Sequence, residues 1–336
     1  MSHRIELTEP RASFEASGDE TLLDAARKAG IHLPHECCLG TCGTCRVRLQ
    51  SGEVDYEDFP PGLTAQEANA GYALACCARP RSDVVLTPER RLAPCSEPAR
   101  YRARVTRIAP IGHDVVHLGI ELPEDARDLV FRPGQYVNVL LEDGHKRSFS
   151  MASGPTGTGL DFHVRRVPGG RFTHHGIEAL RAGDELDLEL PLGTFCHHPE
   201  DYRPMLLIAT GTGLSPLKSI AESLMASDDV PPIALYWGAR TPADLYLHDE
   251  VAQWAERFDD FTYVPVLSRA DVDWRGRKGY VQHAVLEDFP DLSEHAIYLC
   301  GSPDMVRDAR QLFAESGASV DHVYSDAFTF APRVTR

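Results

Sequence analysis

The sequence predicts a multidomain chain of the α+β and α/β classes, in which three differently built segments follow one another. Residues 1–90 combine short alternating strands, one helix and a cluster of cysteines. Residues 101–200 contain short β-rich runs separated by glycine and proline, which predicts an antiparallel β-barrel. Residues 201–336 alternate buried strands, glycine-rich turns and helices, as a parallel α/β sheet does. Two prolines and weak periodicity predict a linker at residues 91–100.

The regular elements are predicted from periodicity and from the residues that end it. Residues 21–29 predict a helix with leucine and alanine on one face, which Gly30 ends. Alternation and apolar runs predict strands at 84–86 in the first segment and at 115–118, 136–140, 161–164 and 186–190 in the second. In the third segment, strands are predicted at 205–209, 233–237, 263–267 and 297–300, with a helix at 216–225.

Length, composition and charge limit the class of protein. The chain has 336 residues, whereas a single hydrophobic core stops growing near about 250 residues. There are 34 Lys and Arg residues against 50 Asp and Glu residues, and the net charge of −16 argues against binding to nucleic acid or to an anionic membrane. No apolar run approaches the about 18 residues of a membrane helix. Residues 1–6 contain no signal-peptide core, so we expect a cytoplasmic protein.

Nine cysteines are present, and six of them lie between residues 37 and 77. An odd number without a secretory signal argues against a disulfide framework and favours a metal. Cys37, Cys42 and Cys45 have the spacing C-x4-C-x2-C, and Cys76 follows after thirty residues. This is the plant-type spacing for a [2Fe–2S] cluster, which needs four thiolates. Glycines 40 and 43 lie between the ligands and allow backbone N–H groups to approach the cluster sulfurs.

Other interpretations of these cysteines are weaker. A zinc site usually pairs two C-x2-C units, and only one is present here. Thiols buried only for packing would not be expected at this spacing. Cys38 in place of Cys37 would break the spacing, whereas spacing alone does not decide between Cys76 and Cys77. The sequence assigns no role to Cys95 or Cys196.

The second segment contains a candidate flavin site at Arg147-Ser148-Phe149-Ser150. A flavin needs a cation for its phosphates, a flat side chain against its ring and a hydroxyl near its redox nitrogen, and these four residues supply all three. In isolation they also fit an ordinary surface loop. Further along, backbone amides at a helix start and a hydroxyl could hold a pyrophosphate. The residues of that region are Val164, Arg165, Gly169, Gly170, Arg171, Phe172 and Thr173.

The third segment contains a candidate nicotinamide site. Gly211-Thr212-Gly213 follows a predicted strand and opens a helix, although the third glycine of the dinucleotide fingerprint is replaced by Pro216. We expect Ser215 to cap that helix and Pro216 to occupy its first position. A plain strand–helix connection is the competing interpretation. Cys300-Gly301-Ser302 stands at the end of another predicted strand, where Cys300 could equally be a simple buried residue.

These motifs together resemble the ferredoxin-first, three-domain reductases of bacterial oxygenases, over about residues 3–330. Residues 33–45 resemble the plant-type ferredoxin loop, and residues 74–83 resemble its fourth-ligand segment, which implies a β-grasp domain with Cys76 as the ligand. Residues 147–150 resemble the R-x-Y-S motif of ferredoxin–NADP reductase-like barrels, with Phe149 in place of the usual Tyr. Residues 300–303 resemble the C-G-x-P motif of the same family.

The resemblance implies a role for each motif. Arg147 would contact the FAD phosphates, Phe149 would stack on the isoalloxazine, and Ser150 would hydrogen-bond toward flavin N5. Cys300 would lie beside the nicotinamide ring. The region of Gly170 and Thr173 favours FAD over FMN. The remaining expected cofactor contacts are Arg240, which could meet a ribose 2′-phosphate, and Phe328, a second stacking ring. The doublets His174-His175 and His197-His198 are expected to be polar surface or helix-start residues rather than ligands.

The resemblance further implies an NAD(P)H-dependent reductase that passes electrons to FAD, then to the [2Fe–2S] cluster and then to a terminal oxygenase. Reductases of terephthalate- and benzoate-type Rieske dioxygenases, which act in aromatic hydrocarbon catabolism, have the most similar pattern. NADH is favoured over NADPH. A diiron monooxygenase or a deoxysugar dehydratase is an alternative acceptor. A redox-sensing module that binds cofactors without turnover is the alternative of a different class.

Overall fold

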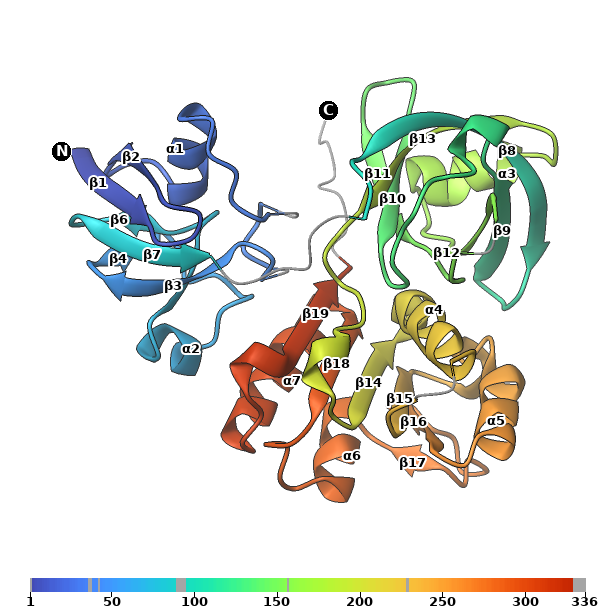
Figure 1. Cartoon of the computed structure of the whole chain (residues 1–336). Helices are drawn as coiled ribbons and strands as arrows, with labels where there is room; N and C mark the ends of the chain where they lie inside the picture. Colours follow the sequence, from blue (N-terminus) through green and yellow to red (C-terminus); the bar gives the residue numbers. More distant parts are fainter. Residues whose placement is uncertain are drawn as a thin grey trace. The chain divides into compact units, whose positions relative to one another are not determined.

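The computed structural model describes residues 2–35, 38–41, 43–88, 95–155, 157–227 and 230–328 (Figure 1). The chain divides into two units, each with its own core. The first contains Met1–Leu92 together with Val306–Glu315, and the second contains Ala93–Met305 together with Ser316–Arg336. No helix among the described residues is both long and apolar enough to cross a membrane.

The first unit is built on a mixed five-stranded sheet in the order β2-β1-β7-β3-β5. Its strands are β1 (Ser2–Leu7), β2 (Ala12–Ser17), β3 (Arg46–Ser51), β5 (Tyr72–Leu74) and β7 (Val84–Pro88), and β4 (Val54–Asp55) pairs separately with β6 (Arg79–Pro80). Among these described strands of the main sheet, β1 and β7 run parallel and the other neighbours antiparallel. The unit also contains α1 (Leu22–Lys28), α2 (Ala65–Asn69) and most of α7 (Pro303–Glu315).

Helix α1 forms where the apolar period predicts it. The Thr21 hydroxyl accepts a hydrogen bond from the Asp24 N–H, and Gly30, at φ +71°, follows the end of the helix. The apolar face of α1 is buried in the first unit. The first N–H groups of the helix donate to the carbonyls of Ala78 and Ala75, at 2.9 Å each. These bonds fix the backbone on both sides of Cys76.

The second unit begins with an antiparallel six-stranded sheet in the order β11-β10-β13-β8-β9-β12, whose strands run from teal through green to yellow-green in Figure 1. Its strands are β8 (Ala99–Pro110), β9 (Val115–Glu121), β10 (Tyr136–Leu140), β11 (Lys146–Ser150), β12 (Gly159–Arg165) and β13 (Glu185–Leu192). Alternate residues of these strands form a closed apolar core that includes Val105, Leu118, Val137, Phe162 and Leu188. The first strand starts at Ala99, inside the range predicted as a linker, and residues 89–94 lie outside the described chain.

The rest of the second unit contains a parallel six-stranded sheet in the order β17-β16-β15-β14-β18-β19. Its strands are β14 (Met205–Thr210), β15 (Ile233–Ala239), β16 (Phe261–Leu267), β17 (Arg277–Lys278), β18 (Ala296–Gly301) and β19 (Val323–Ala327). The chain also forms α4 (Leu214–Met225), α5 (His248–Arg257) and α6 (Val281–Asp288). Because β15 and β18 lie on opposite sides of β14, the direction of winding reverses between β14 and β18, and such switch points bind ligands at the carboxyl ends of the strands.

Short helices complete the second unit. They are η1 (Glu124–Ala126), η2 (Arg171–Gly176, of the π type), α3 (Ile177–Ala179), η3 (Pro199–Asp201), η4 (Gly211–Gly213), η5 (Pro242–Asp244) and η6 (Val320–His322). The doublet at 197–198 lies at the start of η3, as expected. His198 is a helix-start residue rather than a surface one, because it is only 5% exposed and its ring stacks on Tyr324 with 4.0 Å between ring centroids.

Candidate functional site

The predicted cluster ligands lie in the first unit. Cys37 and Cys42 are outside the described residues, whereas Cys45 and Cys76 are described. Cys45 is 3% exposed and directly precedes β3. Its carbonyl accepts the Ala75 N–H at 2.9 Å, so the backbone next to Cys76 is bonded to the backbone of Cys45. Two predicted ligands with thirty residues between them in sequence are therefore held on neighbouring segments.

The cluster loop, residues 37–45, has features that suit a group with acceptor atoms. Gly40 and Gly43 have φ of +69° and +75°, a left-handed conformation that favours glycine. The Thr41 Oγ1 is buried and has no hydrogen-bond partner among the described residues. A buried hydroxyl without a partner is costly, and the sulfur atoms of a cluster accept such hydrogen bonds. The donor set therefore fits a [2Fe–2S] cluster.

Cys76 and Cys77 lie close together, with 3.6 Å between their Sγ atoms. A Cβ placed on Gly40 would come within 2.7 Å of the Cys77 Sγ, so Cys77 also lies against the cluster loop. Burial raises the pKa of the neighbouring Tyr56 to about 12, and the thiols of Cys77, Cys45 and Cys76 contribute to that rise. All three cysteines thus lie near Tyr56, and the choice of Cys76 as ligand stays a prediction.

The candidate flavin residues lie on β11 and just after β12. Phe149 is half-buried, and its ring lies 5.4 Å from the Phe172 ring, measured between centroids. Ser150, at the end of β11, is 7% exposed. Ser148 lies on the face of β11 opposite to Phe149 and donates to the Asn138 Oδ1 at 2.8 Å. Tertiary structure therefore brings together the two segments that sequence analysis predicted for the flavin.

The segment after β12 has a tight turn that excludes side chains. A Cβ at Gly170 would lie 2.1 Å from the Thr173 Oγ1 and 2.9 Å from the Val167 carbonyl oxygen. The Thr173 hydroxyl and the Val167 carbonyl therefore pack directly against the Gly170 backbone, so only glycine fits at this turn, and the pyrophosphate contact stays a prediction. Arg171 forms an ion pair with Asp143, which lies in the turn between β10 and β11. Val164 is fully buried in the barrel core, so only its backbone is available to a cofactor.

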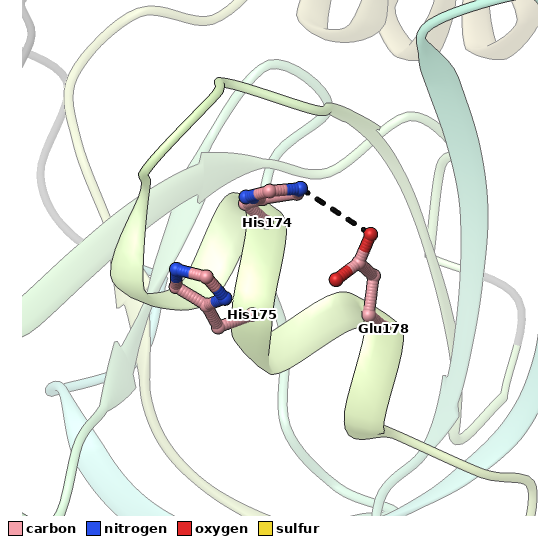
Figure 2. A group of neighbouring side chains, drawn as sticks. All are labelled: His174, His175 and Glu178. Carbon is pink, nitrogen blue, oxygen red and sulfur yellow. Dashed lines mark ion pairs between the residues drawn. The ribbon is translucent and has the colours of Figure 1, made fainter.

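The histidine doublet follows this turn (Figure 2). The His174 and His175 ring centroids are 4.7 Å apart, and the His174 Nε2 lies 3.3 Å from a Glu178 carboxylate oxygen. The Gly169 N–H donates to the His174 Nδ1 at 3.3 Å, so in the neutral ring the proton resides on Nε2 and faces Glu178. Both ring nitrogens of His174 thus have protein partners, which supports a structural role at a helix start.

The candidate nicotinamide residues lie at the switch point of the parallel sheet. We call residues 210–213, at and just after the end of β14, and residues 300–302, at and just after the end of β18, the nucleotide edge. A Cβ at Gly213 would lie 2.2 Å from the Cys300 carbonyl oxygen, and one at Gly301, where φ is +139°, would lie 2.2 Å from the Thr210 Oγ1. The Ser302 N–H donates to the same Thr210 Oγ1 at 2.9 Å. The two loops touch through their backbones, which places Gly211–Gly213 beside Cys300.

Cys300 is fully buried, and burial raises its pKa well above the ordinary value, with a smaller contribution from Asp326. The thiol is therefore neutral near pH 7 and suits packing against a flat ring better than nucleophilic attack. The Phe328 N–H donates to the Gly301 carbonyl at 2.8 Å, so the predicted second stacking residue also lies at this edge. Arg240 is exposed at the carboxyl end of β15.

The helix start at this edge corrects one prediction. Gly213, not Ser215, occupies the N-cap position of α4, and no described side chain caps the helix. Pro216 is the third residue of α4 rather than the first. The reason is that the 3₁₀ turn Gly211–Gly213 runs directly into α4 and starts the helix earlier. Pro216 is tolerated because its missing N–H falls among the four that no helical carbonyl accepts.

One contact of the Gly211 turn was not predicted from sequence, and one predicted flavin residue lies at an unexpected place. Trp237, fully buried near the end of β15, donates its Nε1–H to the Gly211 carbonyl at 3.0 Å. Arg165, predicted as a flavin residue, extends from the barrel to the nucleotide edge, where a Cβ at Gly211 would lie 2.9 Å from its Nη1. Asp114 pairs with Arg165 at 3.1 Å. A polar aromatic residue at the end of a predicted strand was the available signal for Trp237.

The sequence matches three family models in the order that the fold shows. They are a 2Fe-2S iron-sulfur cluster binding domain over residues 5–81, an oxidoreductase FAD-binding domain over residues 102–197 and an oxidoreductase NAD-binding domain over residues 207–311. These matches confirm the predicted fold class and the three predicted kinds of cofactor domain. They do not test which residues hold each cofactor.

Known proteins resemble the chain over nearly its whole length. The CDP-6-deoxy-L-threo-D-glycero-4-hexulose-3-dehydrase reductase of Yersinia pseudotuberculosis is 36% identical, with 98% of this chain and 99% of the relative covered. Reductase component 1 of the terephthalate 1,2-dioxygenase of Comamonas sp is 33% identical, with 99% of both covered. The crystal structure of the Amycolatopsis cytochrome P450 reductase GcoB is 34% identical, with a TM-score of 0.71 and coverage of 97% of this chain and 98% of that one.

Proposed function

The chain belongs to the family of reductases that join a 2Fe-2S domain to FAD- and NAD-binding domains, and we propose that it supplies electrons from NADH to a terminal oxygenase. Members of this family are oxidoreductases, and so is this protein. The proposed route runs from the nicotinamide through FAD to the [2Fe–2S] cluster and out to the partner. When bound, FAD supplies the chemistry that takes up a two-electron hydride and releases single electrons to the cluster.

The observation that carries this proposal is the joining of two loops at the sheet switch point. Gly213 and Cys300 come from different strands, yet a side chain at Gly213 would collide with the Cys300 carbonyl. Arg165 extends to the same edge from the barrel. An extended dinucleotide laid across this edge would meet backbone rather than side chains where the two loops join, and a neutral thiol beside its ring. Ser150, buried at the end of β11, is proposed to hydrogen-bond toward flavin N5.

We propose NADH as the coenzyme for a structural reason. Arg240 is the predicted contact for a 2′-phosphate, yet it is exposed and its guanidinium forms no ion pair with any described residue. Tight binding of a phosphate needs an arginine held in a fixed orientation. The test is to compare kcat/KM for NADH and NADPH. A preference for NADPH that Arg240→Ala abolishes would contradict this part of the proposal.

For the terminal acceptor we propose a Rieske-type aromatic-ring dioxygenase in the cytoplasm, as the terephthalate dioxygenase reductase components suggest. A deoxysugar dehydrase is the second candidate, favoured by the slightly higher identity of 36% to the hexulose dehydrase reductases. Reconstitution of each purified partner with this chain and NADH separates the two. The correct partner should raise NADH consumption, and product should form in proportion.

An anaerobic NADH titration tests the electron route itself. Visible absorption should show bleaching of both flavin and cluster, and electron paramagnetic resonance should show the reduced cluster. Protein without iron and acid-labile sulfide would overturn the proposal. A redox-sensing module without turnover is tested by steady-state reduction of cytochrome c, for which a sensor would show a negligible rate.

A further inference from the structure

A buried group of three charged side chains lies in the first unit, next to the cluster loop. The Glu67 Oε1 accepts hydrogen bonds from the Arg46 Nη1, at 2.6 Å, and from the Arg310 Nη2. The three side chains are only 3%, 6% and 5% exposed, for Glu67, Arg46 and Arg310 respectively. Arg310 lies in the part of α7 that belongs to this unit, and it is 243 residues from Glu67 in sequence. We call these residues the ion triad.

The carboxylate of the triad is held in one orientation. Glu67 is the third residue of α2, and its Oε2 accepts the N–H of the capping residue Thr64 at 2.7 Å. In return, the Thr64 hydroxyl accepts the Glu67 N–H at 3.1 Å. Both carboxylate oxygens are therefore used. The two guanidiniums are thus bound to a carboxylate that the α2 cap holds in place.

The carboxylate of the triad is charged. Burial by itself raises the pKa of Glu67, but the charges of Arg310 and Arg46 and the bond from Thr64 lower it further, so the final pKa lies below the ordinary value. Glu67 is ionised at neutral pH, and one carboxylate faces two cations. Water does not screen charges at this depth as it screens surface charges, so the charge of each triad side chain acts strongly on its neighbours.

Both cations contact or adjoin the cluster loop. Arg46 directly follows the predicted ligand Cys45, and its backbone N–H donates to the Gly43 carbonyl at 3.0 Å. Gly43 lies between the predicted ligands Cys42 and Cys45 in sequence, and its φ is +75°. A Cβ on Gly43 would lie 2.8 Å from the Arg310 Nη1. Arg310 is thus packed against the backbone of the loop.

We propose that Arg310 is a positioning residue that, held by Glu67, fixes the cluster loop and raises the reduction potential of the [2Fe–2S] centre. The inference rests on the proposed function, since it requires that this loop ligates the cluster. Reduction adds one electron, and hence one negative charge, to the cluster. Nearby net charge is one of the factors that set the potential of an iron–sulfur centre, and a cation favours the reduced form.

Potentiometric titration of the holoprotein, followed by electron paramagnetic resonance, tests the inference. Arg310→Gln should lower the potential of the cluster, whereas Glu67→Gln should raise it, because the two changes remove charges of opposite sign. We expect each shift to reach at least a tenfold change in the one-electron equilibrium constant, which corresponds to about 59 mV. The FAD in the same protein provides an internal reference that should not move.

Arg307→Gln is the matched control, since it removes the same charge from the same helix at a position that is 46% exposed. Its cluster potential should equal that of the unmodified protein. If the Arg310→Gln variant does not hold iron but the Arg310→Lys variant does, the positioning role is supported. The cluster potential of Glu67→Gln then tests the effect of the triad charges on reduction. Shifts of the same sign in Arg310→Gln and Glu67→Gln, or no shift in either, overturn the proposal. Failure of the proposed function is distinct, because the unmodified protein would then contain no cluster.

Discussion

The cluster loop and the nucleotide edge are held in place by different means. In the cluster loop, side chains define the site. Cysteines supply the predicted ligands, and the buried ion triad contacts the loop at Gly43. At the nucleotide edge, backbone defines the site, because Gly213 and Gly301 leave no room for a side chain between the two loops. Loss of a ligand side chain should therefore abolish cluster binding at the cluster loop. A substitution at the nucleotide edge should instead weaken coenzyme binding by an amount that depends on the size of the change.

Cys76→Ser should have the most severe consequence. A [2Fe–2S] cluster needs four thiolates, so this variant should lose the visible absorption and the iron of the cluster. It should keep FAD and its NADH-dependent reduction of ferricyanide. Cys77→Ser is the matched control and should retain the cluster. The reverse result in the two variants would assign the ligand to Cys77.

A side chain forced into the nucleotide edge should have the next most severe consequence. In Gly301→Ala, a Cβ would meet the Thr210 hydroxyl at a backbone φ of +139°. Strain and overpacking together should lower the free energy of unfolding by about 2–6 kcal/mol, measured by urea denaturation, and weaken NADH binding.

Gly279→Ala serves as the control for strain alone. Gly279 has φ of +108°, but no described atom lies within 4 Å of its added Cβ. In this variant the free energy of unfolding should fall by about 1–3 kcal/mol, and NADH binding should be unchanged. Equal losses in the two variants would show that close packing of the two loops is not what makes Gly301 necessary.

A more moderate change is expected for Cys300→Ala. The thiol would no longer hold the nicotinamide at the distance that hydride transfer needs, so flavin reduction in stopped flow should slow by about 10- to 100-fold. FAD content should not change. Cys196→Ala is the control, since Cys196 is also buried, with a pKa that burial raises to about 11. Equal rates for Cys300→Ala and the unmodified protein would remove Cys300 from the hydride step.

Trp237→Phe should be the mildest of these variants. This change removes the Nε1 donor to the Gly211 carbonyl but keeps most of the ring in the core. One neutral hydrogen bond is worth about 0.5–1.5 kcal/mol, so the Kd for NADH should rise by about 2- to 12-fold. Isothermal titration calorimetry with NAD⁺, or with NADH under anaerobic conditions, measures this Kd. An unchanged Kd would mean that the barrel's Arg165 and the backbone alone hold the Gly211 turn.

Patterns that are local along the chain were enough to predict the chemistry of the cluster and the order of the domains. Cysteine ligands are side chains at short spacing, so C-x4-C-x2-C is visible in the sequence letters, and strand and helix periods are local as well. Helix α1 and most of the predicted strands lie where those periods place them. Local rules failed where a turn merged with the following helix, as at Ser215, and they did not reveal that the distant Tyr324 ring covers His198.

Which distant residues meet depends instead on the folded arrangement. Arg310 reaches Gly43 and Glu67, and Trp237 reaches Gly211, although nothing in the local sequence around any of them indicates the contact. Periodicity and capping describe forces over a few residues along the chain, so they carry no information about such contacts. Burial of charge and the close approach of two backbones are set by how strands far apart in sequence are ordered in a sheet.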